Sequence, residues 1–274
     1  MTDTENGDCK LTKEVGRFVK SHIIPKSLTR PNISGNKFIE KKVTNRGPFY
    51  GKASDSWYDP NIVTQKGEDI LAYLDTLAIE ELRGLDLVWS SHLFKANSAK
   101  QLNSLRLVKF QRPKLIRKYF LSLLWRAAVT KISAFSEVNL NAKNIELLRQ
   151  IIVGEKEDNR AIFPISLVQL STKGHTVNLA PFKQKMDING GENIYRFYHD
   201  GLVIHMYIDD PRLSVLKSSV DYNHPMFVGL DITIINQINY ENSFQYQNTL
   251  KHTKEYFNHF PSQRPAKASK STHK

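Results

Sequence analysis

Residues 21–26 read Ser-His-Ile-Ile-Pro-Lys, and this short stretch decides how the N-terminal part of the chain is interpreted. Residues 15–19 favour a strand, and His22 follows at its end. Pro25 biases the residue before it toward an extended conformation. A histidine fixed at the end of a strand suits general-base chemistry, because its unperturbed pKa lies near neutrality. The alternative is a histidine with a purely structural or surface role.

The residues on either side of this stretch repeat a three-residue spacing. Cys9 and Thr12 lie upstream, and Thr64 and Gly67 lie downstream with the same separation. Glu68 comes directly after the second pair. Paired cysteines at this separation are typical of structural zinc sites.

This layout resembles the HNH-like (His-Me finger) nuclease family of bacterial defence and toxin modules. Its members carry a Cys-x-x-Cys pair, a Ser-His-Ile-Ile-Pro-Lys string, and a second Cys-x-x-Cys pair followed by glutamate. The resemblance covers residues 8–75 and implies a small ββα region. The resemblance places Cys9, Thr12, Thr64 and Gly67 at the four cysteine positions. Because three of the four cysteines are replaced, the chain resembles a degenerate member, no structural zinc held by four cysteines is expected, and packing is expected to hold the two turns together.

The resemblance also implies a set of catalytic residues. His22 is the expected base that activates water for attack on a phosphodiester, and Arg46 is expected to clamp a phosphate oxygen. Asp59, Asn61 and Glu68 are the expected ligands of one magnesium-like divalent ion. For Glu68 the alternative is structural, since an acidic residue in the first turn of a helix complements the helix dipole.

The composition bounds the compartment and the partners. Among 274 residues there is one cysteine, so an intramolecular disulfide is impossible and a reducing compartment fits. No apolar run approaches the roughly 18 residues of a membrane span, which predicts a cytoplasmic protein without membrane contact. The formal net charge is +12. A strongly basic chain favours polyanions, so nucleic acid is the expected partner.

Part of this charge is concentrated in residues 87–136, which contain no Asp or Glu. Ten Lys and Arg side chains occur there, interleaved with aromatic residues. The pattern predicts a phosphate-binding face with salt-dependent affinity. The alternative is the solvated side of a helix. The side chains assigned to nucleic-acid binding are Lys109, Arg112, Lys114, Arg117 and Lys118.

Hydrophobic periodicity predicts three helices, over 66–83, from Pro113 onward, and over 142–153. Asn141 and Gly154 are the expected caps of the third helix. After residue 160 the pattern changes to β-prone runs, at 162–170, 176–182, 194–198, 202–208 and 226–235. The Asp200-Gly201 step between two of these runs predicts a tight hairpin.

These elements predict an α+β protein with a small N-terminal ββα region, a helical middle and a C-terminal antiparallel sheet. We expect residues 1–90 to form the HNH-like region. Residues 91–260 are expected to form a helical and antiparallel-sheet domain with the basic binding face. Residues 261–274 are basic and lack an apolar pattern, which predicts a disordered tail.

Three functions stay open on the sequence alone. The first is a metal-dependent endonuclease, the toxic effector of an anti-phage or toxin–antitoxin module. Such an effector needs a restraining protein or protein–nucleic-acid antitoxin, because an unrestrained nuclease is toxic to the cell. The second is a catalytically inactive, HNH-derived scaffold that binds nucleic acid or a protein–RNA partner. The third, an activity within residues 160–236, has no residue set that supports it.

Overall fold

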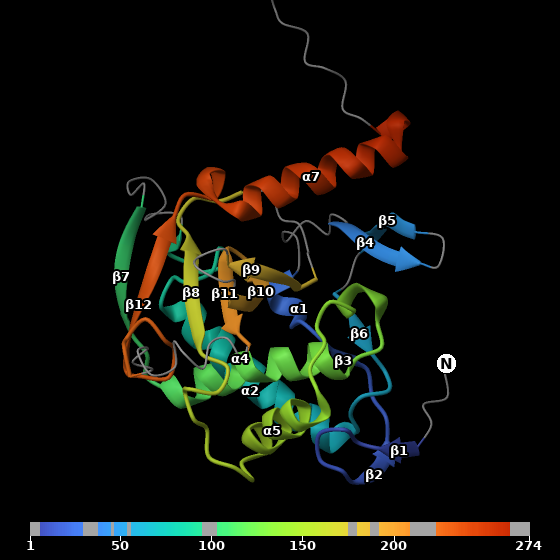
Figure 1. Cartoon of the computed structure of the whole chain (residues 1–274), viewed down its shortest axis with the longest axis vertical. Coiled ribbons are helices and arrows are strands. Elements are labelled where there is room, and N and C mark those ends of the chain that lie inside the picture. Colours follow the sequence, from blue (N-terminus) through green and yellow to red (C-terminus); the bar gives the residue numbers. More distant parts are fainter. Residues whose placement is uncertain are drawn as a thin grey trace, which may run out of the picture.

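Helices and strands pack together as an α+β structure in the computed structural model of the chain (Figure 1), as the sequence predicts. The described residues are 6–29, 38–44, 47–53, 56–94, 103–174, 180–186, 192–208 and 223–263. Among these residues, no helix has the length and apolar character needed to cross a membrane.

A six-stranded sheet with the order β7-β12-β8-β11-β10-β9 forms the centre of the molecule. Neighbouring strands are antiparallel except β12 and β8, which run parallel. The C-terminal antiparallel sheet that the sequence predicts is confirmed, with one parallel pair, and β7 joins it from the middle of the chain by pairing with β12. The strands are β7 (Asn103–Lys109), β8 (Ile165–Leu170), β9 (Phe182–Met186), β10 (Glu192–His199), β11 (Leu202–Tyr207) and β12 (Ile232–Ile238).

Two predicted strands differ in position from the observed ones. The run at 226–235 becomes a strand only from Ile232. Residues 176–179 of the run at 176–182 lie outside the described residues, and a strand begins at Phe182. The β10–β11 hairpin is confirmed, with φ of 47° at Asp200 and 85° at Gly201. Positive φ at both turn residues matches the right-handed twist of the strands, which explains the Asp-Gly step.

Three helices gather on one side of the sheet (Figure 1): α2 (Gln65–Gly84), α4 (Pro113–Val129) and α5 (Ala142–Val153). All three confirm the predicted helices. Proline starts α4 at a position where its missing N–H costs nothing. At α5, the Asn141 side chain accepts the Asn144 N–H at 2.8 Å, and Gly154 ends the helix with a φ of 84°.

The N-terminal part consists of short paired strands followed by α2. β1 (Asn6–Asp8) pairs with β2 (Val15–Arg17), and β3 (Ser21–His22) pairs with β6 (Tyr58–Asp59). A hairpin of β4 (Phe38–Thr44) and β5 (Gly47–Ala53) and the short helix α1 (Lys26–Thr29) lie between β3 and β6 in the sequence. Paired β3 and β6 followed by α2 give the ββα order that the resemblance implies.

One hydrophobic core joins the N-terminal part to the sheet. The same cluster of buried side chains contains Cys9 and Leu71 from the N-terminal side, and Trp125 and Ile235 from the rest of the chain. The predicted boundary at residue 90 therefore does not separate two cores.

The helix α7 (Phe244–His259), which the sequence analysis did not predict, lies across the end of the sheet away from α2, α4 and α5 (Figure 1). It buries Gln245, Thr249 and Tyr256, so it lacks the apolar periodicity that reveals a helix. Most of the predicted tail, residues 264–274, lies outside the described residues. The 3-10 turns are η1 (Ser133–Phe135), η3 (Tyr240–Asn242) and η4 (Pro261–Gln263).

Candidate functional site: the β3–β6 ladder

The candidate site is built on the two-strand ladder between β3 and β6. Ser21 stands opposite Asp59, and His22 stands opposite Tyr58. Directly opposed residues share one face of a sheet, and successive residues point to opposite faces. Ser21 and Asp59, which are 0% and 6% exposed, form the inner face. His22 and Tyr58 form the outer face, where 45% of Tyr58 is exposed.

Asp59 is a structural hydrogen-bond acceptor on the inner face. Its Oδ1 accepts the backbone N–H of Asn61 at 2.9 Å, and its Oδ2 accepts the Thr130 hydroxyl at 2.6 Å. Thr130 directly follows α4, so this bond ties β6 to that helix. Asn61 is exposed in the turn before α2. Both oxygens of Asp59 are therefore engaged inside the protein.

Glu68, in the first turn of α2, also belongs to the inner side. Burial raises the pKa of its carboxyl group, while the nearby Ser21 hydroxyl and Arg126 guanidinium act in the opposite direction. Among the described residues, Glu68 Oε2 and Ser21 Oγ are both buried without a partner at normal hydrogen-bond geometry. The Ser21 hydroxyl therefore acts on the carboxylate as a nearby dipole. Glu68 lies beside Ser21, on the side of the ladder opposite to the His22 imidazole.

Arg126 of α4 organises the buried space behind the ladder. It is 1% exposed and donates to both oxygens of Asp75, at 3.0 and 2.5 Å. It also donates to Ser122 Oγ and to the backbone carbonyl of His22, each at 3.0 Å. Burial acts to lower the pKa of Arg126, but the adjacent Asp75 carboxylate outweighs it and raises the pKa. Arg126 is thus a permanent buried charge that joins α4 to α2 and fixes the backbone of β3.

The four positions of the predicted knuckle meet in space. The Thr12 N–H donates to Cys9 Sγ at 3.4 Å. Burial raises the pKa of the Cys9 thiol, but hydrogen bonds from Thr12 and Thr64 outweigh it and lower the pKa. A Cβ added at Gly67 would lie only 2.7 Å from Cys9 Sγ. Contacts around one buried thiol therefore hold the two turns where the resembling family has four thiolates.

The outer face of the ladder is basic and aromatic. The Lys20 Nζ lies 3.7 Å from the centroid of the Tyr58 ring. The His22 and Tyr58 ring centroids are 6.2 Å apart, with an angle of 58° between the ring planes. The half-exposed Tyr58 ring therefore has an ammonium over its face and an imidazole beside it.

Arg117, predicted to contact nucleic acid, lies instead inside the protein. It is 1% exposed, and its guanidinium binds both oxygens of Asp158 at 2.6 and 3.1 Å. It also donates to the carbonyls of Phe163 and Ile162, at 3.1 and 2.6 Å. The structure corrects the role of Arg117 from phosphate contact to internal ion pair, because its acidic partner comes from outside the acid-free stretch.

The other four residues of the predicted nucleic-acid face differ in their surroundings. Arg112 donates to Glu81 at 3.1 Å and lies 3.5 Å from Glu80, so its charge is also balanced locally. Lys109 and Lys114 are exposed, and Lys118 is half-buried. All four keep some solvent contact, but the Arg112 charge is balanced by Glu80 and Glu81.

The ladder register separates two members of the predicted catalytic and metal-binding set, His22 and Asp59. The ladder places His22 on its outer face and Asp59 on its inner face, where Glu68 also lies. Within the described ranges, no group of three or more His, Cys, Asp or Glu side chains is placed to hold a metal ion. Arg46 lies outside the described residues. The magnesium-like ion stays a prediction.

His199 at the end of β10 is a core residue. It is 1% exposed, and neither ring nitrogen has a hydrogen-bond partner in the described part of the chain. Burial, assisted by the charge of Arg126, lowers its pKa to about 3, so the ring is neutral at neutral pH. The Asp200-Gly201 turn beside it serves the hairpin.

Lys20 and Tyr58 were not predicted as surface residues, nor Arg126 as a buried one. The first two flank the motif residues Ser21 and Asp59, so the alternation of short strands could have placed them on one face. Nothing in the local sequence distinguishes Arg126 from the exposed basic residues, because its partner Asp75 lies on another helix.

Comparison with known proteins adds no family to this geometry: no protein-family model, no curated protein and no solved structure matches the chain.

Proposed function

We propose that this chain is a non-catalytic nucleic-acid-binding protein that uses the outer face of the β3–β6 ladder as a contact surface for single-stranded DNA or RNA. The observation that carries the proposal is the division of the ladder into two faces. The acids that a hydrolytic metal site needs belong to the inner face, and the exposed basic and aromatic groups belong to the outer face.

Hydrolysis by this site lacks support from the inner face. A metal ion in such a reaction must touch the same phosphate that the activated water attacks. Asp59 uses both oxygens for bonds to Thr130 and Asn61, and Glu68 is buried beside Ser21. Neither carboxylate shares the face of His22, so a phosphate near His22 would not reach them across the ladder.

Binding is supported by the distribution of charge. Arg117, Arg126 and Arg149 are 1%, 1% and 5% exposed, and each is paired with at least one carboxylate. The acids that pair with these buried arginines are not available to neutralise lysines at the surface. Most of the net charge of +12 therefore lies at the surface, where lysines can displace counterions from a nucleic acid.

Unpaired nucleotides are the form that suits this surface. An exposed ring such as Tyr58 can stack only on a base that has left a duplex, and stacking of this kind is tolerant of sequence. The family resemblance agrees with a nucleic-acid ligand. It also suggests the competing hypothesis of a metal-dependent endonuclease restrained by an antitoxin.

The test measures binding and cleavage on the same labelled oligonucleotides, single-stranded DNA and single-stranded RNA, with and without magnesium. We expect Tyr58→Ala to weaken binding about tenfold, the loss of one stacked base. Tyr73→Ala, which removes a 62% exposed tyrosine from α2, is the matched control and should bind as the wild type does.

Cleavage distinguishes the two hypotheses. The proposal predicts intact oligonucleotide after incubation with magnesium, and no growth arrest on expression in cells. Magnesium-dependent cleavage that disappears in His22→Ala would establish the nuclease instead. Equal binding by Tyr58→Ala and the wild type would show that the outer face of the ladder is not the binding surface.

A further inference from the structure

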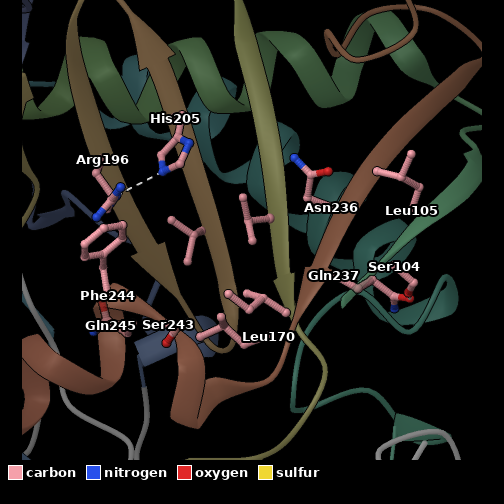
Figure 2. Close-up of a pocket in the computed structure, with 13 residues that line it drawn as sticks. Ser104, Leu105, Leu170, Arg196, His205, Asn236, Gln237, Ser243, Phe244 and Gln245 are labelled. Atoms are coloured by element: carbon pink, nitrogen blue, oxygen red, sulfur yellow. Dashed lines mark hydrogen bonds between the residues drawn. The ribbon is translucent and has the colours of Figure 1, made fainter. Parts of the chain in front are cut away.

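The face of the six-stranded sheet that is turned away from α4 carries a cavity of about 690 Å³ (Figure 2). Residues of β7, β12, β8, β11 and β10 form its floor, and the first turn of α7 closes one end. Cavities of this size hold small organic ligands. Aliphatic side chains such as Leu170 and Val203 supply most of the floor.

A buried cation marks one side of this cavity. Arg196 is 6% exposed, and its Nε donates to Nε2 of the adjacent His205 at 2.9 Å (Figure 2). Because Nε2 accepts this bond, the neutral His205 ring carries its proton on Nδ1. Burial, reinforced by the Arg196 charge, lowers the pKa of His205 to about 4, so the ring stays neutral at physiological pH. Phe244 caps the guanidinium, with its ring centroid 5.2 Å from Cζ.

An amide in the cavity wall points independently to a ligand. Gln245 is 2% exposed, and within the described residues neither its Nε2 nor its Oε1 has a hydrogen-bond partner. A buried amide without partners is costly, and native proteins rarely leave one unsatisfied. Gln245 belongs to the first turn of α7, whose N-terminal N–H groups carry a partial positive charge.

None of the described residues that line the cavity is acidic. Its polar groups are therefore a guanidinium, a neutral imidazole, amides and hydroxyls, together with the positive end of a helix. This set favours an anionic head group, whereas the aliphatic floor favours an apolar body. A planar carboxylate matches the geometry of a guanidinium.

We propose that this cavity binds a small organic carboxylate, with its apolar part on the β8–β11 floor and its carboxylate held by Arg196 and Gln245. The site is separate from the β3–β6 ladder, so it does not depend on nucleic-acid binding. It gives the chain a second ligand, and α7 is the element that the ligand would hold against the sheet.

The test uses 8-anilinonaphthalene-1-sulfonate, a fluorescent probe with an apolar body and one anionic group, displaced by octanoate or by 1-octanol. Octanoate should displace the probe from the wild type at a concentration at least tenfold lower than 1-octanol does. Arg196→Gln removes the charge and should weaken octanoate about tenfold, the size expected for one charge-assisted hydrogen bond. Displacement by 1-octanol should change less than twofold.

A second variant tests the location without touching the charge. Val168→Trp fills the cavity from its β8 floor and should abolish probe binding. Leu107→Trp is the matched control, because Leu107 is 72% exposed on β7 and does not line the cavity. Thermal unfolding of each variant reports whether it is folded.

Three results would overturn the proposal. They are unchanged probe binding in folded Val168→Trp, equal displacement by octanoate and 1-octanol, and no octanoate binding by the wild type. Oligonucleotide binding is measured separately, so these failures leave the function proposed for the ladder untouched.

Discussion

Two arginines of α4 and Lys20 beside the β3–β6 ladder lie in opposite surroundings. Arg117 and Arg126 turn inward and bind Asp158 and Asp75, each arginine being 1% exposed. Lys20 stays at the surface beside the Tyr58 ring. An arginine in a run of basic residues is therefore not available to a phosphate where an acid from another segment pairs with it.

The acidic partners determine whether a basic side chain is buried or stays at the surface. Asp75 lies on α2 and Asp158 follows α5, so both come from outside the acid-free residues 87–136. Arginine suits this buried role because its planar guanidinium satisfies several acceptors at once, as Arg117 does with Asp158 and three carbonyls. Lysine, with a compact and strongly hydrated ammonium, remains in solvent.

Removing the acidic partner of a buried arginine should have the largest effect on stability. Asp75→Ala leaves the Arg126 charge buried without its carboxylate and should lower the free energy of unfolding by about 3–5 kcal/mol. Urea unfolding measures the loss. Asp69→Ala removes an exposed acid from the same helix and should change stability by less than about 0.5 kcal/mol. Equal effects of the two variants would show that Arg126 needs no partner.

Lowering the pH should also destabilise the core near Arg126, where His199 is buried. The pKa of His199 is about 3 in the folded protein, below the ordinary value of 6.5, so the unfolded chain binds more protons between these pH values. The contribution of His199 to the free energy of unfolding is therefore complete above pH 6.5. It decreases as the pH falls below this value, by at most about 1.4 kcal/mol per pH unit.

His199→Leu removes this proton linkage. Its free energy of unfolding, measured in urea from pH 7.5 to 4, should fall less steeply than that of the wild type. His92→Leu, at an exposed position, should leave the slope unchanged. A wild-type slope in His199→Leu would mean that the buried histidine does not titrate on unfolding.

The packing of the knuckle can be tested with two glycines of one helix. A Cβ at Gly67 would lie 2.7 Å from Cys9 Sγ and 2.9 Å from the Val63 Cβ, so Gly67→Ala should destabilise the protein by about 1–3 kcal/mol. At Gly84 a Cβ would meet nothing within 4 Å, so Gly84→Ala should be neutral or slightly stabilising. Thermal unfolding compares them, and a neutral Gly67→Ala would contradict close packing around Cys9.

Local signals made much of the fold predictable. The caps Asn141 and Gly154 fix the ends of α5, and Asp200-Gly201 fixes the hairpin, because each acts through its own backbone. β7 was not predictable in the same way. Its Leu105 and Leu107 are 68% and 72% exposed and only Val108 of its apolar residues is buried, so this strand lacks a clear apolar inner face.

In the candidate site, too, local features were predictable and long-range pairing was not. The spacing of Cys9, Thr12, Thr64 and Gly67 placed the two turns side by side correctly, because a shared knuckle constrains all four positions. The catalytic roles assigned to Asp59 and Glu68 depended on which face of the ladder they occupy. That face follows from the β3–β6 register, which involves strands far apart in the sequence.

The most direct test of the account compares two exposed lysines, Lys20 beside the ladder and Lys114 at the start of α4. Binding of a single-stranded oligonucleotide is measured over a range of salt concentrations for Lys20→Ala, Lys114→Ala and the wild type. The account predicts that Lys20→Ala lowers the slope of log affinity against log salt by about 0.7, one phosphate contact, while Lys114→Ala keeps the wild-type slope. A reduced slope for Lys114→Ala with an unchanged slope for Lys20→Ala would contradict it and return the binding face to α4.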